Sequence, residues 1–190
     1  MFGLFQRQNE WKQTASEIYE KIVAKARHPI FYRDLSVPDT VEGRFEMIIV
    51  HLFILLQDWT VRFGKDDKLS KAIIETFFSD IEHSLREMGI GDLTVPKRMQ
   101  KLADAFYGRV YAYKDALEPN DDDQKLVQAL LRNLYVLEDK THIISEDVRI
   151  SAAKIAQYIR HSLSAFSKQE ENDLSSGQFD FANPEDIIKI

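Results

Sequence analysis

The stretch Met47-Ile48-Ile49-Val50-His51-Leu52-Phe53-Ile54-Leu55-Leu56-Gln57 is the longest uncharged apolar run in this chain of 190 residues. It holds 11 residues between two acidic ones, well short of the roughly 20 that cross a bilayer. Apolar side chains on nearly every side predict a helix that other helices surround. We therefore expect residues 39–63 to form the central helix of an all-α domain, capped by Asp39 or Thr40 and ended by Gly64.

Apolar residues that recur every three or four positions predict further helices on both sides of this run. The shortage of helix breakers agrees, because 7 Gly and 5 Pro are about half the usual share. We expect a single-domain bundle of about six helices, the other five at about 8–27, 67–88, 95–117, 120–137 and 145–166, with a rather apolar loop before residue 39. Thr94 is expected to cap the helix at 95, and the acidic run 121–123 to open the next one.

The chain divides into three parts by composition. We expect an N-terminal segment at 1–10, a helical domain at 11–168 and a polar C-terminal tail at 169–190. The tail is either loosely held or docked by Phe179 and Phe181.

Composition also excludes several classes of protein. The absence of cysteine excludes disulfide scaffolds and thiolate metal sites. With 25 Lys and Arg against 31 Asp and Glu, the net charge of −6 provides no global basic field for binding DNA. The N-terminus reads neither as a signal peptide nor as a transit peptide, so a soluble, cytoplasmic protein is expected. Met1, Phe2, Leu4 and Phe5, near Arg7 and Lys12, predict weak peripheral contact with a membrane.

The residue patterns that catalysis needs are missing. The five histidines form no metal-binding spacing, and no phosphate-binding glycine loop or nucleophile elbow is present, so we expect no catalytic residue, no metal and no cofactor. His51 is the one tempting residue, because it lies inside the apolar run. We favour a core histidine that bonds to a neighbouring helix over a ligand or proton relay. A helical protein that binds quinone, haem or lipid around His51 remains the competing hypothesis.

The helix predicted at 95–117 has two notable faces. Its apolar heptad face is separate from a basic stripe of Lys97, Arg98, Lys101 and Arg109. This stripe indicates either contact with an anionic partner, such as ribosomal RNA or lipid head groups, or ordinary ion pairs with a neighbouring helix. Tyr107 and Tyr111 lie on neither face, and either pack against other helices or remain available to a partner.

Four ordered motifs are more specific. They are Phe31-Tyr32-Arg33-Asp34-Leu35-Ser36-Val37-Pro38-Asp39-Thr40-Val41-Glu42-Gly43-Arg44-Phe45-Glu46 with His51-Leu52, then Ser84-Leu85-Arg86-Glu87-Met88-Gly89-Ile90-Gly91-Asp92-Leu93, Val95-Pro96-Lys97-Arg98 and Ala105-Phe106-Tyr107-Gly108-Arg109-Val110. Together they resemble the signature of the ubiquinol–cytochrome c chaperone family, in its compact bacterial form.

The resemblance implies a helical assembly factor without enzymatic activity. Members of this family in mitochondria bind newly made cytochrome b and help it enter the cytochrome bc complex. They act with a smaller partner protein, near the ribosome and the inner membrane. The expected client is therefore cytochrome b or another membrane protein, with an apolar helix of the client shielded in a groove between helices until assembly.

The resemblance also marks a candidate surface for the client or partner. Its residues are Phe31, Tyr32, Asp39, Gly43, Arg44, Phe45, Glu46, Arg86, Glu87, Lys97, Arg98, Lys101, Tyr107 and Arg109. Gly43 in the first turn of the central helix predicts close approach of another backbone. The start of this helix is then either a binding surface or a structural clamp on the loop 31–37. In the clamp, Arg44 would hold a buried partner.

Overall fold

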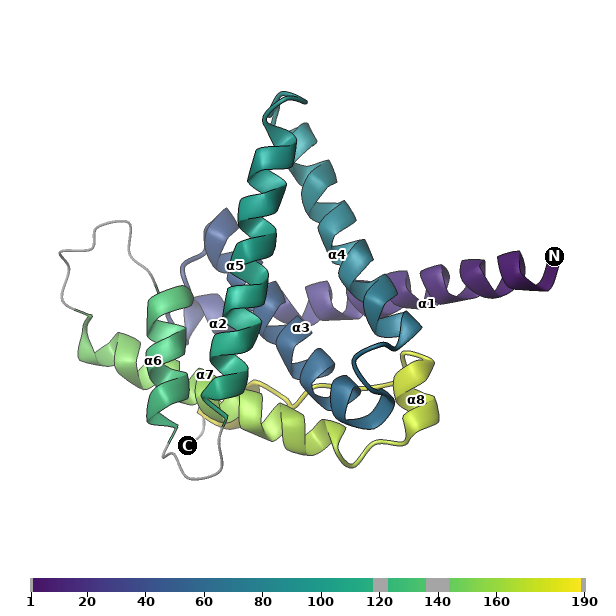
Figure 1. Cartoon of the computed structure of the whole chain (residues 1–190). Helices are drawn as coiled ribbons and strands as arrows, with labels where there is room; N and C mark the ends of the chain where they lie inside the picture. The colour runs from purple at the N-terminus through teal and green to yellow at the C-terminus, as the bar shows by residue number, and fades with distance from the viewer. Residues whose placement is uncertain (1, 118–122, 136–143, 189–190) are drawn as a thin grey trace.

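Helix α3 (Val41–Phe63) lies at the centre of the molecule, as its apolar run predicts (Figure 1). In this computed structural model, which describes residues 2–117, 123–135 and 144–188 and the side chains from Trp11 onward, helices are the only regular structure over those ranges. Every residue from Ile49 to Leu55 is buried. A helix with no polar side in this stretch needs neighbours all round, and α1, α5 and α7 supply them.

The six long helices predicted from the sequence are confirmed. Around α3 lie α1 (Phe2–Ala26), α4 (Lys68–Glu87), α5 (Val95–Asp115), α6 (Gln124–Asn133) and α7 (Glu146–Phe166). Helix α1 packs on α4 and α3, while α7 packs on α3 and α6. Part of the helix predicted at 120–137 falls at residues outside the described ranges.

Three of the long helices begin at a side-chain cap. Thr40 accepts a hydrogen bond from the Gly43 N–H at 3.1 Å, and Asp67 and Ser145 cap α4 and α7. Thr94 stands at the N-cap position of α5, as predicted, but its side chain makes no capping hydrogen bond. Asp123 likewise stands at the N-cap position of α6, but its side chain pairs with Arg160 of α7 and makes no capping bond, while residues 120–122 lie outside the described ranges.

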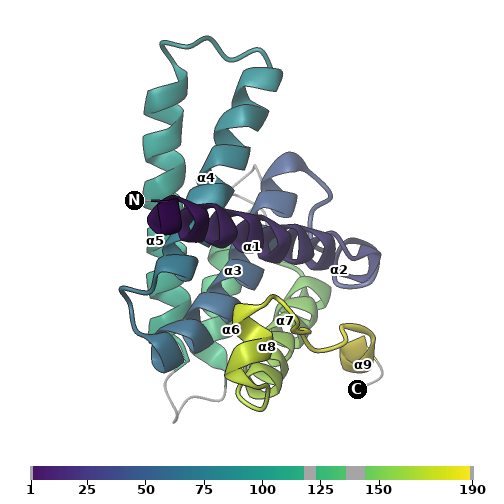
Figure 2. The same cartoon turned by 90° about the vertical axis from the view of Figure 1, so that its right-hand side faces the viewer.

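Three short helices were not predicted. Helix α2 (Pro29–Arg33) occupies the loop before α3, and α8 (Glu171–Ser175) and α9 (Glu185–Ile188) lie in the tail (Figures 1 and 2). The two tail phenylalanines are buried. The ring centres of Phe179 and Phe181 lie 5.2 and 5.0 Å from that of Phe166 at the end of α7. The tail is therefore docked by its aromatic side chains, the second of the two alternatives.

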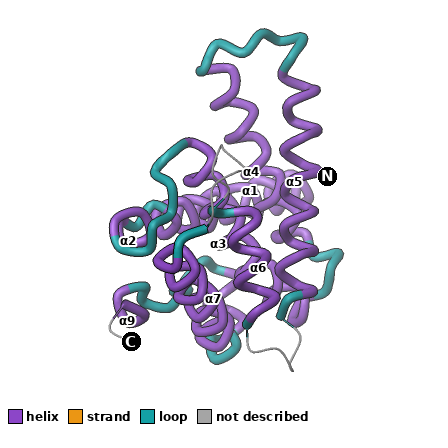
Figure 3. Tube along the Cα trace, turned by 90° about the vertical axis from the view of Figure 1, so that its left-hand side faces the viewer, coloured by secondary structure: helices purple, strands orange, loops and turns teal. Residues whose placement is uncertain are grey.

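The far ends of α4 and α5 form an arm that projects beyond the other helices (Figures 1 and 3). The apolar face of α5 supports this pairing, since Phe106 and Tyr113 are buried and Phe77 and Phe78 of α4 pack on Phe106. Within the described ranges, none of the helices is both long and apolar enough to cross a membrane.

Candidate functional site

The predicted surface at the start of α3 contains three neighbouring residues, which we call the signature patch: the half-buried Tyr32 and the exposed Asp39 and Arg44. Arg44 Nε donates to Asp39 Oδ1 at 2.7 Å, and its guanidinium lies 5.8 Å from the centre of the Tyr32 ring. The Tyr32 hydroxyl donates to the Ala26 carbonyl at 2.7 Å, which anchors the ring to the end of α1. Burial raises the pKa of Tyr32 to about 12, and the bond from Arg44 lowers the pKa of Asp39.

Arg44 does not hold a buried partner, so that part of the clamp hypothesis is wrong. The side chains of Arg44 and Asp39 are 52% and 56% exposed, and water screens an ion pair of that kind strongly. The guanidinium and the carboxylate are therefore both within reach of another molecule.

The clamp itself is made by Gly43. A Cβ atom placed on Gly43 would lie 1.9 Å from the carbonyl oxygen of Pro38, which confirms the predicted close approach of another backbone. The loop ahead of Pro38 is held from the other side as well, because Leu35 and Val37 are buried and Tyr135 donates to the Leu35 carbonyl at 2.7 Å.

Three further predicted site residues face the interior. Phe31 packs on His51 and Tyr158, at 5.5 and 5.2 Å between ring centres, and Phe45 stacks on Phe77. Glu46 is 5% exposed and accepts a hydrogen bond from Arg109 of α5. Burial raises the pKa of Glu46, and the positive charge of Arg109 acts in the opposite direction.

The pairing with Glu46 removes Arg109 from the predicted basic stripe. Lys97, Arg98 and Lys101 are exposed on α5 and form no ion pair with any residue that the structure describes. Arg109 is turned toward α3 instead. The other predicted residues on the arm are exposed: Arg86 pairs with Glu82 and Asp92, Glu87 pairs with His83, and Tyr107 and Tyr111 are open to solvent.

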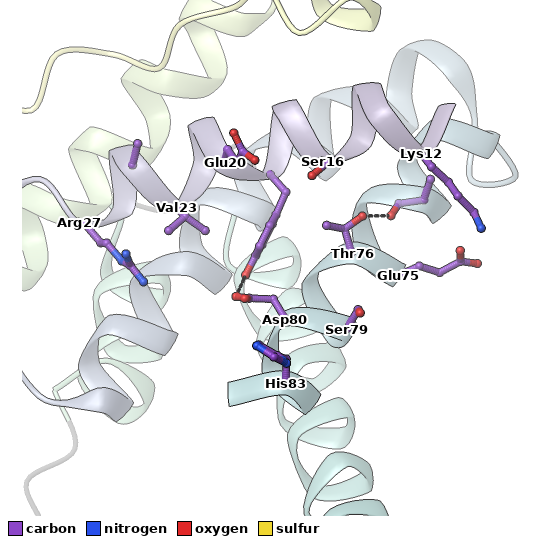
Figure 4. A pocket seen from close by; sticks show the side chains of 13 residues that line it. Lys12, Ser16, Glu20, Val23, Arg27, Glu75, Thr76, Ser79, Asp80 and His83 are labelled. Carbon is purple, nitrogen blue, oxygen red and sulfur yellow. Dashed lines mark hydrogen bonds between the residues drawn. The ribbon is translucent and has the colours of Figure 1, made fainter. Parts of the chain in front are cut away.

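A groove between α1 and α4 was not predicted (Figure 4). Its volume is about 900 Å³, and ten of its 13 lining residues carry a polar or charged group: Lys12, Ser16, Tyr19, Glu20, Arg27, Glu75, Thr76, Ser79, Asp80 and His83, beside Val23, Ala24 and Ala72. Tyr19 donates to Asp80 Oδ2 at 2.8 Å across it. In the sequence, the lining residues of each helix look like an ordinary solvent-exposed helix face. Nothing in the sequence indicated that α1 and α4 lie side by side.

The groove and the signature patch are neighbours. Arg27 lines the groove at the end of α1, and its positive charge acts on the hydroxyl groups of both Tyr19 in the groove and Tyr32 in the patch. The two features together offer charged groups of both signs, among them Glu20, Arg27 and Glu75 in the groove and Asp39 and Arg44 in the patch.

His51 is a core histidine, as favoured from the sequence. Its Nδ1 lies 2.8 Å from the Met47 carbonyl oxygen, which can only accept, so Nδ1 carries the proton. Its Nε2 accepts from the Tyr158 hydroxyl at 2.9 Å. With both ring nitrogens bonded and the residue fully buried, neither nitrogen is open to a haem iron, and the Met47 carbonyl offers no group to pass a proton to. The described residues also contain no group of three or more potential metal ligands.

The stability of the protein is expected to depend on pH through His51. Burial lowers its pKa from 6.5 to about 4, so the neutral ring contributes stability above pH 6.5 that is lost as the pH falls toward 4. The loss attributable to this one residue is about 3 kcal/mol. Urea unfolding of the wild type and of His51→Gln at neutral and acid pH measures it, because the variant lacks the titration. Parallel stability curves for the two proteins would contradict the assignment.

Comparison with known proteins agrees with the motifs. The family model described as "Ubiquinol-cytochrome C chaperone" matches residues 33–181. The chain belongs to the ubiquinol–cytochrome c chaperone family. The matched range extends into the tail as far as Phe181, farther than the sequence motifs reached.

Relatives of this chaperone family are similar in sequence and in structure. The "Ubiquinol-cytochrome-c reductase complex assembly factor 1" of Xenopus laevis is 27% identical over 66% of this chain and 63% of its own length. "Protein CBP3, mitochondrial" of Saccharomyces cerevisiae is 25% identical over 81% of this chain and 44% of its own. The crystal structure of the Cbp3 homolog from Brucella abortus is 37% identical, with a TM-score of 0.75 over 97% of each chain. The chain thus spans about half to two thirds of the length of these curated relatives, but nearly all of the Brucella chain.

Proposed function

We propose that this chain is a non-enzymatic assembly factor that binds cytochrome b during biogenesis of the ubiquinol–cytochrome c reductase complex. The observation that carries the proposal is the family match, which includes Asp39 and Arg44 of the signature patch, the arm, and the tail as far as Phe181 in one continuous range. The buried polar residues His51 and Glu46 would be the first candidates for catalytic residues. Both are engaged in structural hydrogen bonds, which supports a non-enzymatic role. A smaller partner protein, the ribosome and a cytoplasmic site at the inner membrane remain predictions of the resemblance.

The polar lining of the α1–α4 groove determines which part of a client it fits. An apolar transmembrane helix placed there would desolvate Glu20, Arg27 and Glu75 without compensating hydrogen bonds, which is costly. A polar loop or terminus of the client would find donors and acceptors instead. We therefore propose that the groove and the signature patch hold a polar segment of cytochrome b that lies outside the membrane.

Arg44 tests this proposal directly. Because its side chain is half exposed, Arg44→Ala is expected to leave the melting temperature unchanged. The same variant is expected to lose most of the cytochrome b that co-purifies with the wild type, since a charge-assisted contact is lost. Client recovered with the tagged protein from membranes, and the level of assembled cytochrome bc complex in the same strain, are the two measurements.

A matched control is available next to the patch. Arg33 is 74% exposed and also pairs with an aspartate, Asp34, but lies outside the signature patch. Arg33→Ala should retain the client. Full client recovery with Arg44→Ala would show that the patch does not bind it, whereas the absence of cytochrome b from the wild-type preparation would contradict the proposed function itself.

A further inference from the structure

The end of the arm presents apolar side chains to solvent. Leu93 is 98% exposed and Met88 is 56% exposed, and Ile90 between them is partly exposed. All three lie in the loop that joins α4 to α5, at the point farthest from the rest of the fold (Figures 1 and 2). We call Met88, Ile90 and Leu93 the arm tip.

Hydrogen bonds hold this loop in shape. Gly89 adopts a φ of +78° after the end of α4, and the Ile90 N–H donates to the Leu85 carbonyl at 3.1 Å. The Thr94 N–H then donates to the Gly91 carbonyl at 2.8 Å, ahead of α5. Leu93 is therefore held outward by an ordered turn and does not fold back onto the helices.

Positive charge gathers directly behind the tip. The first two turns of α5 carry Lys97, Arg98 and Lys101, all exposed and without an ion pair to any described residue. Arg86, the other basic residue near the tip, is already paired with Glu82 and Asp92, so the unpaired positive charge belongs to the start of α5. In a chain with a net charge of −6, these three residues form a locally basic surface that an anionic partner would contact.

The shape of the tip indicates what kind of partner it suits. A stable protein interface buries roughly 800 Å² on each side and needs complementary shape, which a narrow turn with three apolar side chains does not provide. A bilayer surface needs no such complementarity, because lipids rearrange around inserted side chains. Shallow apolar insertion combined with adjacent basic residues is a known way to bind anionic membranes reversibly.

We propose that the arm tip docks on bilayers that contain anionic phospholipid. Met88, Ile90 and Leu93 enter the head-group region, and Lys97, Arg98 and Lys101 contact lipid phosphates. This contact is separate from the peripheral membrane contact predicted for residues 1–7, whose side chains lie outside the described ones. It does not depend on which client the chain binds.

Liposome flotation of the purified full-length protein tests the proposal. Vesicles of phosphatidylcholine with about one third phosphatidylglycerol are compared with vesicles of phosphatidylcholine alone. The wild type should float with the first and not with the second, and less at high salt. Met88→Ser/Leu93→Ser should bind about tenfold more weakly. Lys97→Glu/Lys101→Glu should bind about 100-fold more weakly, because each basic residue contributes about fivefold and each reversal adds repulsion.

Two matched control variants change residues far from the arm tip, one in α3 and one at the start of α4. Val61 is 79% exposed near the end of α3, so Val61→Ser removes an equally open apolar side chain elsewhere. Lys65 and Lys68 are exposed at the start of α4, so Lys65→Glu/Lys68→Glu makes the same charge change far from the tip. Both controls should float like the wild type.

Three results would overturn the proposal. In the first, the tip variants remain folded by circular dichroism and float like the wild type. In the second, the controls lose as much binding as the tip variants. In the third, deletion of residues 1–7 alone abolishes flotation. Tip variants that float normally but lose a co-purifying protein would identify the tip as a protein contact instead. The Arg44 experiment on client binding is unaffected by any of these results, so the two proposals fail separately.

Discussion

Gly43→Ala is expected to destabilise the protein by roughly 3 kcal/mol, because the new methyl group would lie 1.9 Å from the Pro38 carbonyl oxygen. The obstacle is backbone, which cannot rotate away as a side chain can. Relief therefore requires the loop before α3 to move off the helix, and the buried Leu35 and Val37 would move with it. For a chain of this size, the melting temperature should fall by about 10 °C. Circular dichroism melts and urea unfolding measure the change.

Gly108 provides the control for this substitution. It lies within α5, is exposed, and has no atom within 4 Å of the position its Cβ would take. Gly108→Ala should therefore stabilise the protein by up to about 1 kcal/mol through helix propensity. Equal losses in the two variants would show that the close approach at Pro38 is not the cause.

Arg109→Ala is expected to cost roughly 3–5 kcal/mol, because it leaves the carboxylate of Glu46 buried between α3 and α5 without its partner. An exposed ion pair would not behave in this way. Arg44→Ala, which breaks the exposed pair with Asp39, therefore serves as the comparison and should melt like the wild type.

The loss in Arg109→Ala is expected to be smaller at acid pH. Burial already raises the pKa of Glu46 above its ordinary 4.5, and removal of Arg109 raises it further. A carboxyl group whose pKa is higher in the folded state favours folding at low pH, and that contribution is lost as the pH rises through the folded-state value. The variant should thus lie closer to the wild type at about pH 5 than at about pH 8.

A second substitution shows whether Arg109→Ala destabilises the protein through the unpaired charge of Glu46 or through lost packing. Glu46→Gln removes the charge that Arg109 neutralises, so Glu46→Gln/Arg109→Ala should recover part of the stability lost in Arg109→Ala. Urea unfolding of the single and double variants at both pH values gives the coupling. A deficit that is the same at both pH values and is not relieved by Gln would indicate lost packing rather than a stranded charge.

The sequence was sufficient for features that depend on neighbours along the chain. The six long helices follow from apolar spacing, and the central position of α3 follows from an apolar run without a polar side. Gly43 was identified because glycine is a poor choice for a first helical turn unless something lies close. The family was evident from ordered motifs of consecutive residues.

Features that depend on how helices pack were beyond the reach of the sequence. Arg109 lies 63 positions from Glu46, and only the crossing of α3 and α5 turns it from a member of a basic stripe into the partner of a buried carboxylate. The α1–α4 groove exists because two polar helix faces happen to meet, and each face alone resembles any solvated surface.

The tail also combines a property that the sequence shows with one that only packing reveals. Residues 169–190 are polar on average, and only contact with Phe166 and His51 reveals that Phe179 and Phe181 belong to the core. Periodicity and capping act within one or two turns, so the sequence by itself determined where the helices are and which side of each is apolar. Pairing between helices depends on loop paths and on side-chain shapes that meet far apart in the chain, so only the tertiary structure decided which charges are buried, which are free and where the grooves and the arm tip lie.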